Sequence, residues 1–385
     1  MYLLKYGNGW EMMPGDKRFP LRVAYNDEGT LEYENMHDGQ RAWFENLAEE
    51  IHTIKKYGKS IENEYCKVWN AFTKKGKKKH SSSRSQNGEW ILHNTREEVT
   101  ITEKPHLITT TWHQGITGPL QFVEHYNMYC PIQSNGIYHK PAGCTPVAGG
   151  QVLLHLYKQG WSLSGIPNVA MPNSTMSEYT FTSPTTSLWG NVRNGSTDAI
   201  AKLLGHVGVL SHTTYTDNGS GAYLRNDLEN AFVHYGVNCS ILNSWDITKM
   251  KNNLNSNLPV IVSMTGRDNK KNKDVGHTVI VDGYKHINTR YTDVYIYVDN
   301  PDTYPGDIYD HEEGMDPVPG EGPTQEDTYT VESDYLYINW GYGAIDNTSY
   351  YVLHDLYYYY TDETTGNKYR VTFDREKRML YNLSK

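Results

Sequence analysis

Apolar residues recur at helical spacing in the first part of the chain. Five of them follow the three- and four-residue spacing of an amphipathic helix. They are Trp43, Phe44, Leu47, Ile51 and Ile54. Asp38 stands before this run and is a suitable N-cap, since its carboxylate can accept from the first free N–H groups. We therefore predict a helix over residues 34–58, preceded by two strands.

The helical pattern ends before residues 74–87, where Lys and Ser dominate. A basic run without apolar periodicity is typical of a solvated loop, with a processing site or a surface tether as the alternatives. Strand-like stretches resume at 90–92 and 98–102. We place a domain boundary after them, so that residues 1–104 form a first domain and residues 105–385 a second.

The second domain shows helical patterns first and strand patterns later. The predicted helices cover residues 144–157, 198–207 and 225–235. The predicted strands cover residues 258–264, 276–284, 294–298, 335–340 and 350–353. Helices followed by strands are typical of an α+β fold, in which the helices pack on a mostly antiparallel sheet.

Residues 299–334 interrupt the strand patterns and are rich in Pro, Gly and acidic residues. This composition predicts a long surface insertion between two strands. Dense acidic residues also occur in calcium-binding loops, but this stretch does not follow the EF-hand spacing. We therefore favour an insertion over a calcium site.

The composition narrows the classes of function. The formal net charge is −9 and the pI is near 6.0, so the chain lacks the basic face that a nucleic-acid partner requires. No apolar run approaches the roughly 18 residues of a membrane span. Tyr is abundant, with 32 residues against 7 Phe, which suits a sheet with hydrated edges because Tyr carries both a ring and a hydroxyl.

The four cysteines are Cys66, Cys130, Cys144 and Cys239. They are too sparse for a disulfide scaffold, and none forms the CxxC pair of a zinc site, so we expect no metal or other cofactor. The first residues show no charged region followed by an apolar stretch. We therefore expect an export signal to lie outside the numbered chain.

Cys144 stands where the first helix of the second domain is predicted to begin, after Gly143 and two residues before Pro146. Proline is tolerated in a first turn because its missing N–H would have no partner there. A thiol at a helix N-terminus is near free N–H groups and the positive end of the dipole, which lower its pKa. The alternative is a buried structural cysteine.

His277 follows Gly276 at the head of a strand rich in β-branched residues. Such a histidine can project its imidazole into a cleft, although many histidines in this setting are structural. Together with Cys144, it could take the thiol proton and hold a thiolate–imidazolium pair.

Two further segments supply polar groups of a catalytic kind. The Asn339 amide can orient an imidazole, and Trp340 beside it can shield that hydrogen bond from water. The Gln114 amide can donate to a developing oxyanion together with the backbone N–H of Cys144. Taken alone, each segment is also consistent with an ordinary strand end.

These segments, in this order, resemble the streptopain family of papain-like cysteine peptidases. The matching segments are 112–114, 126–131, 143–148, 276–277 and 339–343, with family-like residues also at 199–204 and 218–222. In the first domain, residues 15–20 and 24–29 and the helix around Trp43 resemble the family's inhibitory propeptide.

The resemblance implies a papain-like α+β fold, with a helical subdomain and an antiparallel sheet, preceded by an α+β prodomain. It implies a secreted or cell-envelope endopeptidase, made as a zymogen, that removes its own propeptide within residues 74–105. Protein or peptide substrates and the propeptide itself, as an intramolecular inhibitor, are then its partners. Catalysis would proceed through a thioester acyl-enzyme.

The resemblance also assigns roles to individual residues. Cys144 corresponds to the nucleophile, and His277 to the general base and later acid. Gln114 corresponds to the oxyanion donor, Asn339 to the residue that orients the histidine, and Trp340 to its shield. The residues expected to border the substrate cleft are Ser220, Gly221 and Gly276.

The chain departs from the family pattern in three places. The separation of His277 and Asn339 is long, and we attribute it to the acidic insertion. The predicted helix after Cys144 carries Gly149 and Gly150, which cost about 1 kcal/mol each relative to Ala, so we expect a soft helix. Tyr342 stands where a second Trp is usual.

Three other classes of function remain as alternatives. A peptidase-like protein could bind partners or peptides without cleaving them. A cysteine amidase or acyltransferase could use the same dyad, although a peptidase-type propeptide disfavours it. A metalloenzyme is least favoured, since no HExxH or CxxC motif is present.

Overall fold

The computed structural model describes most of the chain. The described residues are 1–27, 29–33, 36, 38–57, 65–66, 69, 89–114, 126–163, 169–170, 180–181, 186–217, 219–268, 273–298, 324–343, 350–351, 357–361, 368–372 and 377–385. The basic run at 74–87 and the acid-rich residues 299–323 lie outside them.

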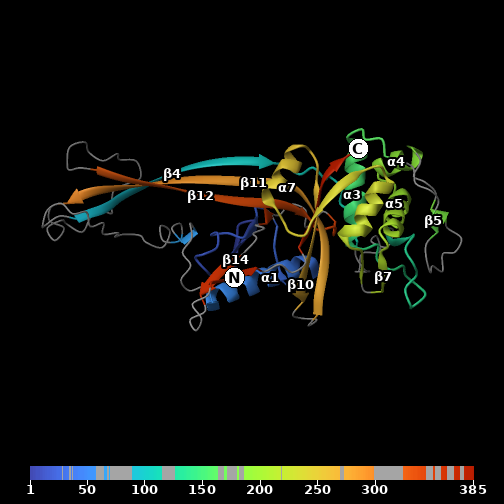
Figure 1. The fold of residues 1–385 in the computed structure, drawn as a ribbon, viewed down its shortest axis with the longest axis horizontal. Helices are drawn as coiled ribbons and strands as arrows, with labels where there is room; N and C mark the ends of the chain where they lie inside the picture. The colour runs from blue at the N-terminus through green and yellow to red at the C-terminus, as the bar shows by residue number, and fades with distance from the viewer. Residues whose placement is uncertain are drawn as a thin grey trace.

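A 10-stranded antiparallel sheet runs through the molecule (Figure 1). Along the sheet the order is β1-β2-β3-β13-β12-β11-β10-β16-β9, and β4 also pairs with β11. Its strands are β1 (Tyr2–Tyr6), β2 (Gly9–Met13), β3 (Ala24–Asn26), β4 (Glu89–Lys104), β9 (Asn238–Leu242), β10 (Val260–Asp268), β11 (Lys273–Val298), β12 (Thr324–Asn339), β13 (Tyr350–Tyr351) and β16 (Arg378–Ser384). The mixture of helices with an antiparallel sheet confirms the predicted α+β class.

The helices and the short hairpins surround this sheet. The helices are α1 (Asp38–Tyr57), α3 (Cys144–Lys158), α4 (Thr186–Arg193), α5 (Thr197–Leu210), α6 (Glu229–His234) and α7 (Ile247–Asn255), with a π-type turn at Leu224–Leu228 before α6. The two-stranded hairpins are β5 (Val169–Ala170) with β6 (Thr180–Phe181), β7 (Thr214–Thr216) with β8 (Gly219–Gly221), and β14 (Tyr357–Thr361) with β15 (Lys368–Thr372). No helix among the described residues is long and apolar enough to cross a membrane.

The centre of the sheet is buried on both faces. Successive side chains of a strand point to opposite faces, and β11 shows this directly. Ile280 belongs to the core cluster that contains α3 and α5, whereas Val279 and Val281 belong to the cluster that contains α1. The near-continuous apolar run that predicted this strand therefore reflects a layer of structure on each side.

Helix α3 is buried along nearly its whole length. Its two glycines let neighbouring side chains approach closely. A Cβ at Gly149 would lie 2.7 Å from Leu228 Cδ1, and one at Gly150 would lie 2.8 Å from Leu204 Cδ2. The glycines that predicted a soft helix are thus required by close packing, and the surrounding core stabilises the helix instead.

A three-stranded arm leaves the body of the molecule, formed by β4, the second half of β11 and β12 (Figure 1). The strand predictions at 276–284 and 294–298 are therefore two parts of the single strand β11. Residues 324–334 belong to β12 and pair with β11, so the prediction that they form part of a surface insertion was wrong. The arm also explains the long separation of His277 and Asn339.

One strand of the arm, β4, precedes the predicted domain boundary after residue 104. Strand β4 pairs with β11 from Lys104↔Tyr284 to Glu89↔Val298, although the sequence placed it in the first domain. Strands β1–β3 of the first domain belong to the same sheet, through the pairing of β3 with β13. The boundary after residue 104 therefore stays a prediction.

Candidate active site

Cys144 is the first residue of α3, as the sequence predicted, and its side chain is 9% exposed. The preceding Gly143 has a φ of 93°, which favours glycine, and a Cβ there would lie 2.4 Å from the Ser220 carbonyl oxygen. Since the first N–H groups of a helix lack intrahelical partners, the thiol lies at the positive end of α3.

His277, on β11, lies near the Cys144 thiol and favours its charged form. Burial alone would raise the pKa of this thiol, but the interaction with His277 and the charge of His277 outweigh it. Smaller contributions come from the Thr278 backbone N–H and the Thr145 hydroxyl. Together they lower the pKa of Cys144 from 9.0 to about 7, so a large fraction of the thiol is thiolate near neutral pH.

Thr145 ties the start of α3 to its neighbours. Its hydroxyl donates to the Ala222 carbonyl over 2.8 Å and lies 3.1 Å from the Thr278 hydroxyl. Both threonines are buried. They fix the nucleophile helix against the strand that carries His277, and sequence patterns did not point to either of them.

Two aromatic rings enclose His277 on one side. The ring of Trp340 stacks with it at 5.9 Å between centroids and an interplanar angle of 18°, and Tyr342 stacks at 5.6 Å and 10°. The Nε2 atom of His277 lies 3.2 Å from the Trp340 carbonyl oxygen. When Nε2–H donates to this carbonyl, Nδ1 is the ring nitrogen that remains available to the Cys144 thiol.

The Asn339 side chain makes different contacts from those the sequence suggested. Its Oδ1 accepts from the Gly341 N–H over 3.0 Å, and its Nδ2 donates to Gln151 Oε1 over 3.3 Å. In this structure the carbonyl of Trp340, and not the amide of Asn339, accepts from His277. Asn339 shapes the turn that presents this carbonyl.

Gln114 reaches the same carbonyl. Its Nε2 donates to the Trp340 oxygen over 3.2 Å, while its backbone N–H donates to the Gly341 carbonyl over 2.9 Å. The side chain is buried. An amide nitrogen carries two hydrogens, so one remains for another acceptor. The structure therefore brings Gln114, His277 and Trp340 together around one oxygen atom.

The three residues predicted to border the cleft differ in their surroundings. A Cβ at Gly221 would lie 4.0 Å from Cys144 Sγ, and Ser220 lies against Gly143. These two residues on β8 therefore flank the nucleophile. Gly276 is exposed, and a Cβ there would meet nothing within 4 Å. It directly precedes His277 in β11.

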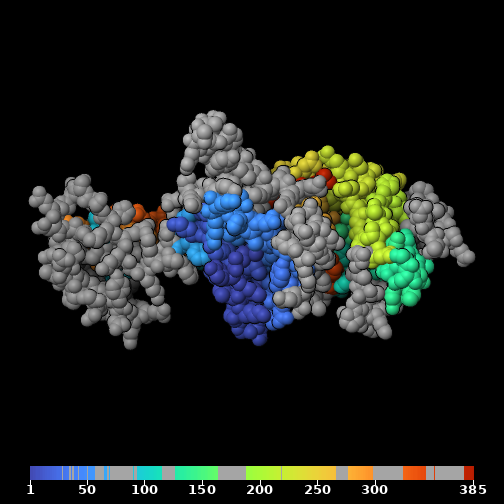
Figure 2. Space-filling model, turned by 90° about the horizontal axis from the view of Figure 1, so that it is seen from below, coloured from blue at the N-terminus to red at the C-terminus, as the bar shows by residue number. Residues whose placement is uncertain are grey.

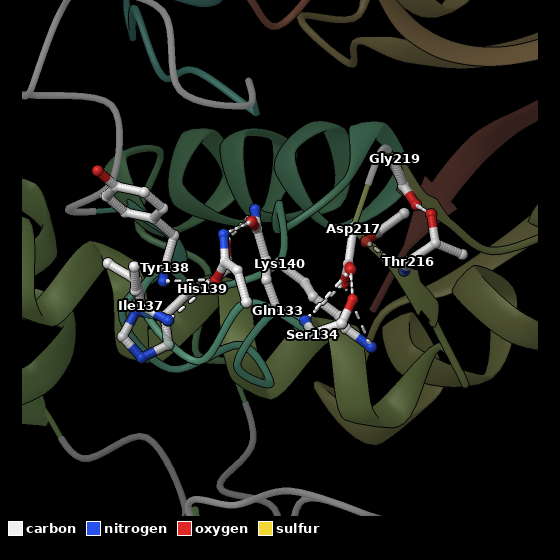
Figure 3. A network of polar contacts seen from close by, with 11 residues as sticks. Gln133, Ser134, Ile137, Tyr138, His139, Lys140, Thr216, Asp217 and Gly219 are labelled. Carbon is white, nitrogen blue, oxygen red and sulfur yellow. Dashed lines mark hydrogen bonds and ion pairs between the residues drawn. The ribbon is translucent and has the colours of Figure 1, made fainter.

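A polar network holds the β7–β8 hairpin in place (Figure 3). The Asp217 carboxylate accepts from the Ser134 N–H at 3.2 Å and from its hydroxyl, and Lys140 Nζ lies 3.9 Å away. Thr216 donates to the Gly219 carbonyl within the hairpin. The segment that leads into Cys144 is thereby tied to the hairpin that flanks the thiol.

The N-terminal segment covers the site. In Figure 2 it forms a continuous blue block on the face seen there. Helix α1 packs on β10 and β11, and its Asn46 amide donates to the Thr265 carbonyl over 3.1 Å. Gly39, in the first turn of α1, lies directly on the imidazole, since a Cβ there would lie 2.2 Å from His277 Cδ2. His277 is consequently only 5% exposed.

Cys130 and Cys239 form no disulfide and lie outside this site. Burial raises the pKa of Cys130 to about 12 and that of Cys239 to about 12, so both remain protonated at neutral pH. Within the described part of the chain, no group of three or more His, Cys, Asp or Glu side chains could hold a metal ion. The site thus consists of a single activated thiol with a histidine partner.

A helix-start thiolate paired with a strand histidine defines a cysteine hydrolase site. Residues 121–298, which include both groups, match the model of the Peptidase C10 family. This match supports a cysteine peptidase, and residues 121–298 resemble that family, the streptopain family. Gln114 and Asn339 lie outside the matched range.

A search of curated proteins found no match. Eight chains of solved structures match. One is the structure of active wild-type Prevotella intermedia interpain A cysteine protease. It is 21% identical, covers 72% of this chain and 94% of its own, and has a TM-score of 0.42.

Proposed function

We propose that the chain is an endopeptidase of papain-like fold, made as a zymogen, with Cys144 as nucleophile and His277 as its base. The observation that carries this proposal is the position of Cys144 at the N-terminus of α3 with His277 nearby, where the pKa of the thiol falls to about 7. The match to the Peptidase C10 family supports protein substrates. The fold proposal rests on the arrangement of the dyad, with the thiol on a helical layer and the histidine on the sheet.

The first half of the reaction forms an acyl-enzyme. The Cys144 thiolate attacks the carbonyl carbon of the scissile peptide bond, and its oxygen becomes an oxyanion. The backbone N–H of Cys144 and the second hydrogen of the Gln114 amide stabilise this charge. His277 then gives its proton to the leaving amine, and a thioester on Cys144 remains.

The second half releases the acid product. His277, now neutral, takes a proton from water, and the resulting hydroxide attacks the thioester. The Trp340 carbonyl accepts from His277 Nε2 throughout and holds the ring in one orientation. Trp340 and Tyr342 keep water away from that hydrogen bond.

The proposed inhibitory segment is the first domain. Gly39 presses on the His277 ring, and the rest of α1 packs on the strands beside it, so a substrate could not reach the histidine while α1 is seated. Release of α1 by cleavage would expose the dyad. We propose that this cleavage falls before Glu89, within the basic run at 74–87, because β4 pairs along its length with β11, the strand that carries His277.

Secretion or residence in the cell envelope is proposed on the family resemblance. Fractionation of the producing cells tests it, since activity and protein should appear outside the cytoplasm. Recovery of the full chain from the cytoplasm alone would contradict it.

The function is tested by incubating purified full chain in reducing buffer with casein, wild type beside Cys144→Ala. The wild type should lose its N-terminal segment and degrade casein, while Cys144→Ala stays intact. The new N-terminus should lie before Glu89, and one within residues 90–105 would contradict the retention of β4. Maturation of Cys144→Ala at the wild-type rate would exclude Cys144 as nucleophile. Inactivity of both proteins, even after limited proteolysis of the basic run, would indicate a peptidase-like binding protein.

A further inference from the structure

Gln151 is a buried polar residue on the nucleophile helix that the proposed reaction does not use. It lies seven residues after Cys144, two turns along α3, so both side chains lie on the same side of the helix. Its side chain is 1% exposed. A buried amide is costly unless it is hydrogen-bonded, and its bonds therefore show what it holds in place.

The Gln151 carbonyl oxygen accepts two hydrogen bonds from different segments. Thr110, four residues before Gln114, donates its hydroxyl over 2.7 Å. Asn339, at the end of β12, donates its Nδ2 over 3.3 Å. One oxygen atom thus joins the three segments that carry Cys144, Gln114 and the Trp340 carbonyl.

The orientation of both amides follows from their partners. Asn339 Oδ1 accepts from the Gly341 N–H, so its nitrogen must be the atom that faces Gln151. Gln151 must then present its oxygen. Its Nε2 is buried and has no partner among the described residues, so the oxygen alone accounts for its polar contacts.

We propose that Gln151 is a positioning residue for the catalytic histidine. It acts through Asn339: the bond to Gln151 fixes the Asn339 amide, and Asn339 Oδ1 then fixes the turn through the Gly341 N–H. This turn aims the Trp340 carbonyl at His277 Nε2 and Gln114 Nε2. The inference rests on the proposed function, since it assumes that His277 activates Cys144.

The proposal predicts a change at the thiol, which Gln151 does not touch. In Gln151→Met the Asn339 amide loses its acceptor, the Trp340 carbonyl is held less firmly, and His277 bonds less well to Cys144. Since His277 is what lowers the pKa of Cys144, the pH midpoint of Cys144 alkylation should move upwards by about one unit. The kcat/KM for a peptide substrate should fall about tenfold, mostly in kcat.

The experiment measures iodoacetamide labelling of Cys144 against pH in the full chain, with the labelled peptide identified by mass spectrometry. Thr110→Val is the matched control, because it removes the other donor to the same oxygen and leaves the Asn339 bond intact. It should keep the wild-type midpoint. If Gln151→Met fails to fold, Thr110→Val/Gln151→Met replaces that buried pair by apolar groups, and its midpoint should shift relative to Thr110→Val.

A wild-type midpoint in Gln151→Met, or in the double variant where only that one folds, would overturn the inference. So would an equal shift in Thr110→Val. Failure of the proposed function has a different signature: the wild type itself would then label with a midpoint near 9 and leave casein intact.

Discussion

The two halves of β11 lie in opposite surroundings. The first half, from His277 to Val281, is buried between helices on both faces and carries the candidate catalytic histidine. The second half is the central strand of the arm, beside β4, whose Val99 and Ile101 are more than half exposed. One strand therefore joins a site whose geometry is fixed by core packing to an arm that combines exposed positions, such as Ile101, with buried ones, such as Tyr295.

The two halves of β11 differ in how firmly their side chains are held in place. In the buried half, the pair formed by Cys144 and His277 is surrounded by apolar side chains, threonines and backbone groups. Close packing holds each of these groups in one arrangement. In the arm, pairs of aromatic rings face each other across strands, as Tyr291 and Tyr329 do at 5.2 Å. Substitutions in the first half should disturb folding and catalysis, and those at exposed positions of the arm should disturb neither strongly.

The largest effect on stability is expected at the buried half. Ile280→Ala deletes a fully buried side chain between α3 and the sheet, and it should lower the free energy of unfolding by about 3 kcal/mol. Ile101→Ala on the arm is the matched control and should change it by less than about 0.5 kcal/mol. Urea unfolding of the three proteins measures both. Equal losses of unfolding free energy in the two variants would show that the arm unfolds together with the core.

The next effect concerns catalysis. Gln114→Ala removes the proposed oxyanion donor and should lower kcat about 100-fold, with KM little changed. The variant also loses its bond to the Trp340 carbonyl, so the Cys144 alkylation profile must be recorded beside the kinetics. An unchanged kcat would remove Gln114 from the reaction.

A smaller effect is expected where α1 meets β11. Gly39→Ala places a methyl group within 2.2 Å of the His277 ring, so α1 can no longer seat closely. Self-processing should become about fivefold faster, since a loss of roughly 1 kcal/mol in that contact exposes the dyad more often. His52→Ala, at an exposed position of α1, should process at the wild-type rate. Slower processing of Gly39→Ala would contradict the inhibitory role of α1.

The smallest effect is expected in the arm. Tyr291→Thr removes one ring of a cross-strand pair and should cost less than about 1 kcal/mol of stability. Casein hydrolysis by the matured variant should equal that of the wild type. A clear loss of activity would mean that the arm takes part in substrate binding.

The same contrast explains which parts of the fold the sequence could predict. The buried run at Val279–Val281 and the apolar spacing in α1 are strong patterns, and the structure confirms the strand and the helix there. In the arm, the patterns at 90–92, 98–102 and 294–298 predicted pieces of β4 and β11, and the polar stretches between them left the full length of these strands unmarked. Helix α7 was missed because only Met250 and Leu254 contribute buried side chains.

The site could be predicted in part, for a related reason. Cys144 stands at a helix start, and His277 directly precedes the apolar run of β11, so local sequence carries information about both. The contacts of Gln151, Thr145 and Gly39 depend on which elements pack together, and no local pattern reports that. The acceptor for His277 is a backbone carbonyl, which any residue at position 340 would supply.

The account's central claim is that His277 activates Cys144. The most direct test is the pH dependence of Cys144 alkylation in the full chain, with His277→Ala beside the wild type. Because the thiolate is the reactive form, a lowered pKa moves the rise in rate to lower pH. We expect a midpoint near pH 7 in the wild type and near or above 9 in His277→Ala. A wild-type midpoint near 9, or one that His277→Ala leaves unchanged, would contradict the account.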